Sequence, residues 1–191
     1  MQSCLCDSVE MLAARQCAPV LTGIKPANIL VVKNRKEEEV QACFAGTGVS
    51  CRLIDEEAGR AVWFIYRENK QYEIIRTRSC GGFLETLGYA GEDLEEMLDK
   101  MAVRFRAYQA GEGSFPHEMG IFLGYPLEDV KGFIEHEGKD YLYQGYWKVY
   151  GDVEKCKKMF SVYNRVKAQV VEEIEKGKAL WQAAVSIRVP A

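Results

Sequence analysis

Hydrophobic residues recur at helical spacing in two long stretches of the chain. Between residues 92 and 108 the apolar positions lie three or four residues apart, which predicts an amphipathic helix. Its first turn holds Glu92 and Asp93, which are favourable against the helix dipole. A second helix is expected from the cap Asp152 to the stop Gly177. Its apolar stripe comprises Val153, Cys156, Phe160, Tyr163, Val166, Val170 and Ile174.

Other stretches have the pattern of strands. Residues 29–33, ILVVK, form a continuous apolar run rich in β-branched side chains, which predicts a central strand buried on both faces. The segments 49–55 and 61–67 flank a turn, EEAGR, and predict a hairpin. The aromatic segment 141–150, YLYQGYWKVY, predicts a last strand.

Shorter helices are predicted between these elements. Asp7 or Ser8 caps the first, over 7–17, and Asn34 caps one that runs to about Phe44. Two more, 69–78 and 81–88, are separated by Cys80-Gly81-Gly82. The last is expected to begin at Pro126, to stop at Gly138 and to bury Leu127, Val130, Phe133 and Ile134.

The order of these elements predicts an α/β fold that borders on α+β. We expect a small mixed sheet of about four strands packed with helices in a single layered domain. The predicted domain covers residues 1–177, and residues 178–191 form a C-terminal tail. Two alternatives are open for this tail: it is loosely ordered, or its Trp181 docks on a partner.

Composition narrows the functional class. The net charge of −3 over 191 residues gives no basic footprint for nucleic acid. No apolar run approaches the roughly 20 residues that a membrane span needs. The first residues lack the charged and apolar regions of a signal peptide. We therefore expect a cytoplasmic protein that binds neither nucleic acid nor membrane.

The seven cysteines are expected to be reduced structural thiols. Cys4 and Cys6 form a C-x-C pair near the start, and the others are scattered singly. A tetrahedral zinc site normally shows paired ligands at short spacing, and this pattern is absent. We predict no bound metal, and the residues identify no cofactor.

The unusual chemistry of the chain is concentrated between residues 115 and 152. This stretch holds both histidines, of which His117 is followed directly by Glu118. A histidine beside a carboxylate is suited to general acid–base work, since imidazole titrates near neutral pH. The alternative is that these two residues begin a short helix and bond to backbone groups.

Aromatic residues and glycines of this stretch allow two interpretations as well. On a strand, Tyr141, Tyr143 and Trp147 share one face, while Tyr146 and Tyr150 share the other. One face packs on helices, and the other either belongs to the core or offers stacking surface to a flat ligand or a partner. The glycine pairs at 46–48 and 81–82 lack a Walker or dinucleotide pattern and are more typical of turns.

Two motifs in the chain resemble a known family. The run HEMGIFLGYPLEDVKGFI at 117–134, followed by GYWKVY at 145–150, is similar to the bacterial domain-of-unknown-function family 3793. The segment GIKPAN at 23–28 resembles the family's N-terminal motif, so the resemblance spans about residues 7–165. The chain departs from the family around residues 68–80. The resemblance implies no established activity, and the flavodoxin-type and iron-related genes near its members suggest a role auxiliary to redox or metal metabolism.

The polar residues of these motifs are the candidate site. We propose His117 and Glu118 as catalytic residues and Lys25, Asn28, Lys148 and Tyr146 as ligand-binding residues. If the last strand pairs beside the first, at least three of the five residues Lys25, Asn28, His117, Glu118 and Lys148 should line one pocket suited to a small anionic ligand.

Three functions follow from this reasoning. The first is a cytoplasmic protein that binds a ligand or a partner. The second is a small enzyme that uses the His117–Glu118 pair on an anionic substrate, and a pocket holding His117, Lys25 and Lys148 would favour it. The third is a protein-interaction module, which an exposed aromatic face would favour.

Overall fold

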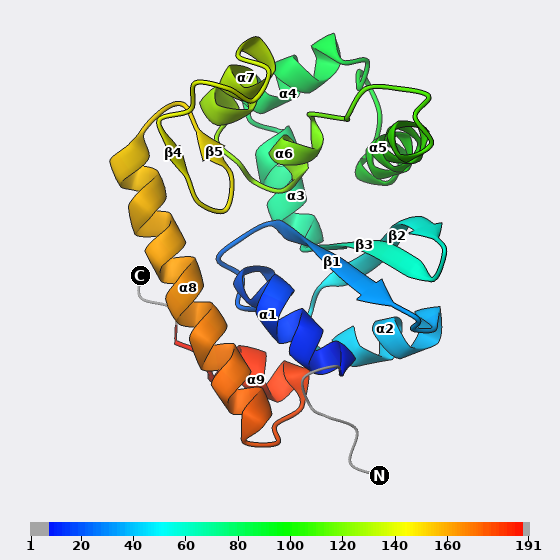
Figure 1. Cartoon of the computed structure of the whole chain (residues 1–191), viewed down its shortest axis with the longest axis vertical. Coiled ribbons are helices and arrows are strands. Elements are labelled where there is room, and N and C mark those ends of the chain that lie inside the picture. Colours follow the sequence, from blue (N-terminus) through cyan, green and yellow to red (C-terminus); the bar gives the residue numbers. More distant parts are fainter. Residues whose placement is uncertain (1–7, 189–191) are drawn as a thin grey trace. The chain divides into compact units, whose positions relative to one another are not determined.

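The structure of the protein is a computed structural model that describes residues 8–188 (Figure 1). The chain divides into two compact units. Of the described residues, the first unit contains 8–68 and 163–188, and the second contains 69–162. Helices and antiparallel sheet occur together, which confirms the mixed α/β class. The single domain over 1–177 stays a prediction.

The helices and strands follow in this order: α1 Val9–Leu21, β1 Ala27–Lys33, α2 Glu37–Phe44, β2 Ser50–Glu57, β3 Arg60–Tyr66, α3 Glu68–Ile75, α4 Arg78–Thr86, α5 Leu94–Gln109, α6 Met119–Phe122, α7 Leu127–Glu135, β4 Tyr143–Gln144, β5 Lys148–Val149, α8 Val153–Glu175 and α9 Leu180–Ser186. Within residues 8–188, no helix has the length and apolar character that crossing a membrane requires.

The sheet of the first unit has three antiparallel strands in the order β1-β3-β2. The central strand is therefore β3, which is buried from Ala61 to Tyr66, and the prediction of a central strand at 29–33 is wrong. An apolar run shows that a strand is buried but not where it lies in a sheet. The outer edge of β1 is instead covered by Gln16, whose amide accepts from Val31 N at 3.0 Å and donates to Val31 O at 3.3 Å.

The predicted hairpin at 49–67 is confirmed as β2 and β3. Its two turn residues, Ala58 and Gly59, have φ of 47° and 76°, as the favoured two-residue hairpin turn requires. Asn34 does not cap α2 as predicted: it also has a positive φ, and its N–H donates to Gly59 O at 2.7 Å. The N-cap of α2 is Lys36.

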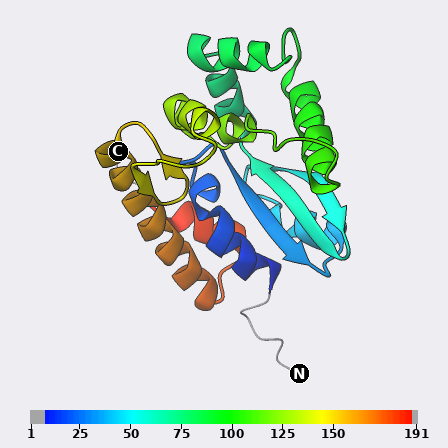
Figure 2. The same ribbon diagram turned by 45° about the horizontal axis from the view of Figure 1, so that its top comes forward.

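Helix α1 packs against β1 in the first unit (Figure 2). Small buried residues on α1, among them Ala13, Ala14 and Ala18, let the helix lie close to the strand. The helix begins with the expected cap Ser8, whose side chain accepts from Met11 N, and runs four residues further than predicted, to Leu21. Asp7, the alternative cap, lies outside the described residues.

The second unit combines helices α3 to α7 with the hairpin β4–β5 and the start of α8. Helix α5 begins with a capping box formed by Asp93 and Glu96, and the amphipathic pattern predicted for it is confirmed. The helix expected at 126–137 is α7, and Pro126 is its N-cap. Of the four residues predicted to be buried, Val130 is buried, Leu127 and Phe133 are half-buried, and Ile134 is exposed. Gly81 and Gly82 lie inside α4, whose cap is Thr77, and do not separate two helices.

The aromatic segment 141–150 does not form the predicted strand. It folds into a hairpin of two-residue strands, β4 and β5, which pair only with each other among the described residues. The predicted mixed sheet of about four strands is therefore replaced by a three-stranded and a two-stranded antiparallel sheet. Backbone groups that a longer strand would need are taken elsewhere, since Tyr150 N donates to the carboxylate of Asp129.

The C-terminal part of the chain contains two helices. In α8 the predicted apolar stripe is buried from Cys156 to Ile174, Asp152 caps the helix through Lys155 N, and Gly177 has a φ of 84° at its end. In the expected tail, residues 180–186 form α9, which packs on α1 and α2 of the first unit. Leu180 of this helix is buried, and Trp181 is half exposed.

Candidate functional site

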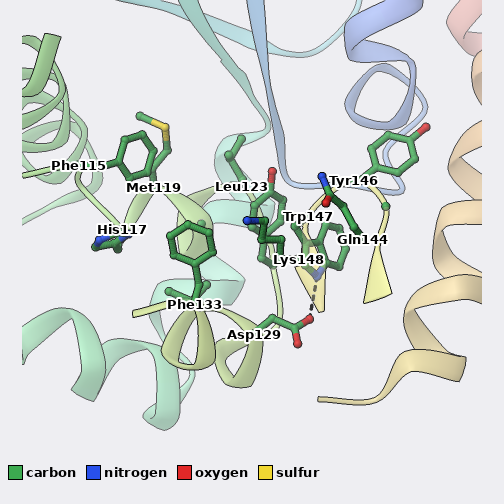
Figure 3. Close-up of a pocket in the computed structure, with 14 residues that line it drawn as sticks. Phe115, His117, Met119, Leu123, Asp129, Phe133, Gln144, Tyr146, Trp147 and Lys148 are labelled. Atoms are coloured by element: carbon green, nitrogen blue, oxygen red, sulfur yellow. Dashed lines mark hydrogen bonds between the residues drawn. The ribbon is translucent and has the colours of Figure 1, made fainter. Parts of the chain in front are cut away.

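A cavity of about 330 Å³ lies within the second unit (Figure 3). Its walls come from the segment before α6, from α6 and α7, and from the hairpin β4–β5. The lining residues are mostly apolar and aromatic: Phe115, His117, Met119, Gly120, Leu123, Tyr125, Asp129, Val130, Phe133, Gln144, Gly145, Tyr146, Trp147 and Lys148. The volume falls at the lower end of the range for small-molecule sites, about 300–1,000 Å³.

Glycines let the walls of the cavity approach one another. A Cβ on Gly120 would lie 2.8 Å from Val130 Cγ2, and one on Gly145 would lie 2.3 Å from the Phe160 ring. Both distances are too short for any other residue without a shift of the neighbour. Gly120 and Gly145 are therefore explained by close packing of α6 on α7 and of the hairpin on α8.

Asp129 ties α7 to the hairpin and to α8. Its Oδ2 accepts from Trp147 Nε1 at 2.7 Å (Figure 3) and from Cys156 Sγ at 3.6 Å. Its Oδ1 accepts from the backbone N–H groups of Tyr150 and Gly151, at 2.7 and 2.8 Å. A buried carboxylate is costly unless it is hydrogen-bonded, and here both oxygens are satisfied. Asp129 thus holds the cavity wall in place and has little capacity left for a ligand.

Aromatic stacking fixes the ring of Trp147. The Tyr125 ring stacks on it with a centroid distance of 4.5 Å and an interplanar angle of 25°. The Phe160 ring meets it edge-on at 4.5 Å and 83°. Both arrangements are among those that aromatic pairs prefer. Burial raises the pKa of Tyr125 to about 12, so its hydroxyl is neutral at physiological pH.

Lys148 supplies the positive charge of the cavity. Its ammonium donates to Gly138 O at 2.7 Å and lies over the rings of Tyr141 and Phe133, at 4.9 and 5.8 Å from their centroids. An ammonium has three protons to donate, and the carbonyl takes one of them. Lys148 therefore has donors left for a ligand.

His117 lines the opposite side of the Phe133 ring (Figure 3). Its imidazole contacts the rings of Phe115 and Phe133, each at a centroid distance of 5.5 Å. Burial lowers the pKa of His117, and the negative charge of Glu118 opposes this shift without cancelling it. The imidazole is therefore neutral at physiological pH, with one N–H donor and one acceptor nitrogen.

Glu118 is buried but does not line the cavity. Its Oε1 accepts from the Tyr89 hydroxyl at 2.8 Å and pairs with Arg104 Nη1 at 2.8 Å. Burial, followed by the charge of Glu118, raises the pKa of Tyr89. The carboxylate connects α6 to α5 and to the loop after α4. The short helix of the alternative prediction is present as α6, with Glu118 as its N-cap, but the carboxylate bonds to side chains and not to backbone groups.

A family model described as "Protein of unknown function (DUF3793)" matches residues 13–183. The chain belongs to this family. No curated protein and no solved structure matches it. The matched range contains both motifs on which the resemblance rested. It also contains every residue that lines the cavity.

The structure of this DUF3793 member places the predicted site residues in different surroundings. His117, Lys148 and Tyr146 line the cavity, whereas Glu118 lies in the salt bridge with Arg104. The prediction that at least three of the five polar residues line one pocket is not met here, because His117 and Lys148 are the two that do. Its premise was also wrong, since the hairpin β4–β5 does not pair with β1.

Lys25 and Asn28 belong to the first unit. Lys25 is buried, and desolvation lowers the pKa of its ammonium to about 8. Asn28 is buried at the start of β1, and its Oδ1 has no hydrogen-bond partner among residues 8–188. Their assignment as ligand-binding residues stays a prediction.

Sequence reasoning about this DUF3793 chain missed Asp129, Tyr125 and Gln144. Asp129 looked like an ordinary acidic residue in the first turn of a helix, where the dipole favours it. Phe133 was expected in the core, yet it lines the cavity. The aromatic residues at 141–150 did indicate that this segment is part of a site. Their partners could not be predicted, because contacts between distant segments determine them.

Among the described residues no three His, Cys, Asp or Glu side chains are grouped to hold a metal ion.

Proposed function

We propose that the protein binds a small organic anion in the cavity of its second unit. The observation that carries this proposal is the ammonium of Lys148 at a surface that is mostly aromatic and apolar. The acidic lining residue, Asp129, accepts from four donors of the cavity wall, so it has no acceptor position left to pair with Lys148. A ligand with one negative group and an apolar body complements such a surface.

The other two functions have less support. An acid–base pair needs the carboxylate and the imidazole to converge on a substrate, and Glu118 is bonded to Tyr89 and Arg104. The hairpin does expose Tyr141 and Tyr143 at 40% and 38%, but the polar groups that line the cavity favour a small molecule.

The proposal includes a cytoplasmic location, which the five cysteines without a disulfide among the described residues support.

Isothermal titration calorimetry tests the proposal by measuring the affinities of two acids and of their uncharged amides. We expect benzoate and hexanoate to bind more tightly than benzamide and hexanamide, because only the acids can pair with the ammonium. Lys148→Met keeps much of the apolar stem but removes the charge, and it should weaken binding of benzoate about tenfold to a hundredfold. Lys158→Met, an exposed lysine on α8, is the matched control and should leave binding unchanged.

Two outcomes would overturn the proposal. One is that the amides bind as tightly as the acids. The other is that Lys148→Met and Lys158→Met bind benzoate equally well while both retain the circular dichroism and melting temperature of the wild type.

A further inference from the structure

The imidazole of His117 has polar capacity that the fold does not use. It is half-buried, and its side chain makes ring contacts but no hydrogen bond within residues 8–188. Neither ring nitrogen is among the buried side-chain atoms of residues 8–188 that lack a partner, so both stay accessible. Because the pKa of His117 is lowered by burial, the ring is neutral and can both donate and accept. A ligand in the cavity can therefore form a hydrogen bond with it.

The size of the cavity suits a small ring system. Its volume of 330 Å³ is about eleven times the roughly 30 Å³ that one water molecule occupies in the liquid. A single aromatic ring with two small substituents therefore fits this space.

The walls of the cavity favour a planar molecule. Five aromatic side chains line it, from Phe115, Tyr125, Phe133, Tyr146 and Trp147. The Trp147 ring is already held by Tyr125, by Phe160 and by its bond to Asp129, so it loses little freedom on binding. A flat ring gains stacked or edge-on contacts with such side chains that a puckered saturated ring does not.

The two polar groups lie on either side of one ring. The Lys148 ammonium is 5.8 Å and the His117 ring 5.5 Å from the centroid of Phe133. Figure 3 shows the two side chains on opposite sides of the Phe133 ring. A ligand ring that packs on Phe133 can therefore present one substituent to the ammonium and the other to the imidazole.

We infer that the ligand is a planar aromatic carboxylate with a second hydrogen-bonding group, such as a hydroxyl, at the far end of the ring. Its carboxylate pairs with Lys148, its ring packs among the aromatic side chains, and its hydroxyl bonds to His117. This inference rests on the proposed function and specifies the class of anion.

Titration of the full chain with four probes tests the inference: 4-hydroxybenzoate, trans-4-hydroxycyclohexanecarboxylate, benzoate and hexanoate. We expect 4-hydroxybenzoate to bind about tenfold more tightly than its saturated counterpart, which carries the same two substituents. It should also bind about fivefold more tightly than benzoate, which lacks the hydroxyl.

The two histidines provide a matched pair of variants. His117→Leu should abolish the preference for 4-hydroxybenzoate over benzoate and leave the affinity for benzoate within about twofold. His136→Leu, which removes a histidine that stacks on Tyr150 and does not line the cavity, should retain the preference. If His117→Leu fails to fold, His117→Asn keeps a donor and an acceptor on a shorter side chain and should reduce the preference.

The possible results distinguish failure of the inference from failure of the proposed function. If hexanoate and the saturated acid bind as tightly as the aromatic acids, the inference fails while the proposed anion site stands. If His117→Leu keeps the preference for the hydroxyl, His117 does not contact the ligand and the inference fails at that residue. If none of the four acids binds, both the inference and the proposed function are wrong.

Discussion

Four hydrogen bonds converge on the carboxylate of Asp129, and the geometry of the cavity depends on them. Two of the donors are backbone N–H groups at the end of the hairpin, and the others are the side chains of Trp147 and Cys156. An acceptor with two ionised oxygens is needed, because all four partners donate. Neutral side chains of similar shape cannot satisfy the same set.

Asp129→Asn should therefore destabilise the protein by about 3 kcal/mol, since its amide NH₂ would face groups that also donate. Urea unfolding followed by circular dichroism measures this loss. Asp140→Asn is the matched control: Asp140 is exposed with a φ of 54°, which asparagine tolerates, so the free energy of unfolding should change by less than about 0.5 kcal/mol. Equal losses in the two variants would show that the contacts of Asp129 contribute nothing to stability.

His117 should make stability depend on pH. Its pKa is lowered in the folded state from its ordinary value of 6.5, so the unfolded chain binds the proton more readily. The contribution of His117 is fully present above about pH 6.5 and is lost as the pH falls through the lowered folded value. Between about pH 7 and pH 5 the wild type should lose more stability than His117→Gln. A stability curve of His117→Gln that runs parallel to that of the wild type would contradict the prediction.

At the scale of the elements, close approach of backbone decides where glycine is needed. The adjacent glycines of α4, Gly81 and Gly82, differ in the space around the position of a Cβ atom. A Cβ on Gly81 would lie 2.7 Å from the carbonyl oxygen of Ile75, whereas one on Gly82 would meet nothing within 4 Å. The two positions have the same helical backbone but different surroundings.

Gly81→Ala should cost about 1–3 kcal/mol, because a backbone oxygen cannot move away as a flexible side chain can. Gly82→Ala should instead stabilise the protein by about 0.5–1 kcal/mol, because alanine loses less conformational freedom in a helix. Melting temperatures of the two variants, measured under the same conditions, test the expected loss of stability in Gly81→Ala and the expected gain in Gly82→Ala. Stabilisation by both substitutions would show that α4 and the end of α3 are not packed as described.

At the scale of the whole molecule, the chain returns to its first unit after the second is complete. Helix α8 begins in the second unit and ends in the first, and α9 then packs on α1 and α2. The first unit is therefore built from both ends of the chain. Its stability should depend on residues that the sequence alone assigned to a tail.

Leu180→Ala should reduce the free energy of unfolding by about 2–4 kcal/mol, because the side chain of Leu180 is 2% exposed. Val185→Ala removes an apolar side chain from the same helix but at 73% exposure, and should cost less than about 0.5 kcal/mol. Urea unfolding of both variants measures the difference. Equal, small losses would mean that residues 180–186 are not docked on the first unit.

The sequence by itself determined the features that depend on neighbours along the chain. The apolar stripes of α5 and α8 and the turn at Ala58-Gly59 could be predicted because helix and hairpin periodicity is local. Family membership followed from the motifs at 117–134 and 145–150. His117, Lys148 and Tyr146 were selected from the sequence, and all three line the cavity.

Only the tertiary structure decided which polar groups are used by the fold and which are available. Glu118 and Asp129 are both acidic residues near a helix start, yet one pairs with Arg104 and the other with Trp147. These partners lie 14 and 18 residues away along the chain. Local periodicity carries no information about such pairs, because packing between elements sets them. For the same reason the sequence did not predict the hairpin in the aromatic segment 141–150: its backbone bonds to Asp129 of α7, a partner that packing between elements supplies.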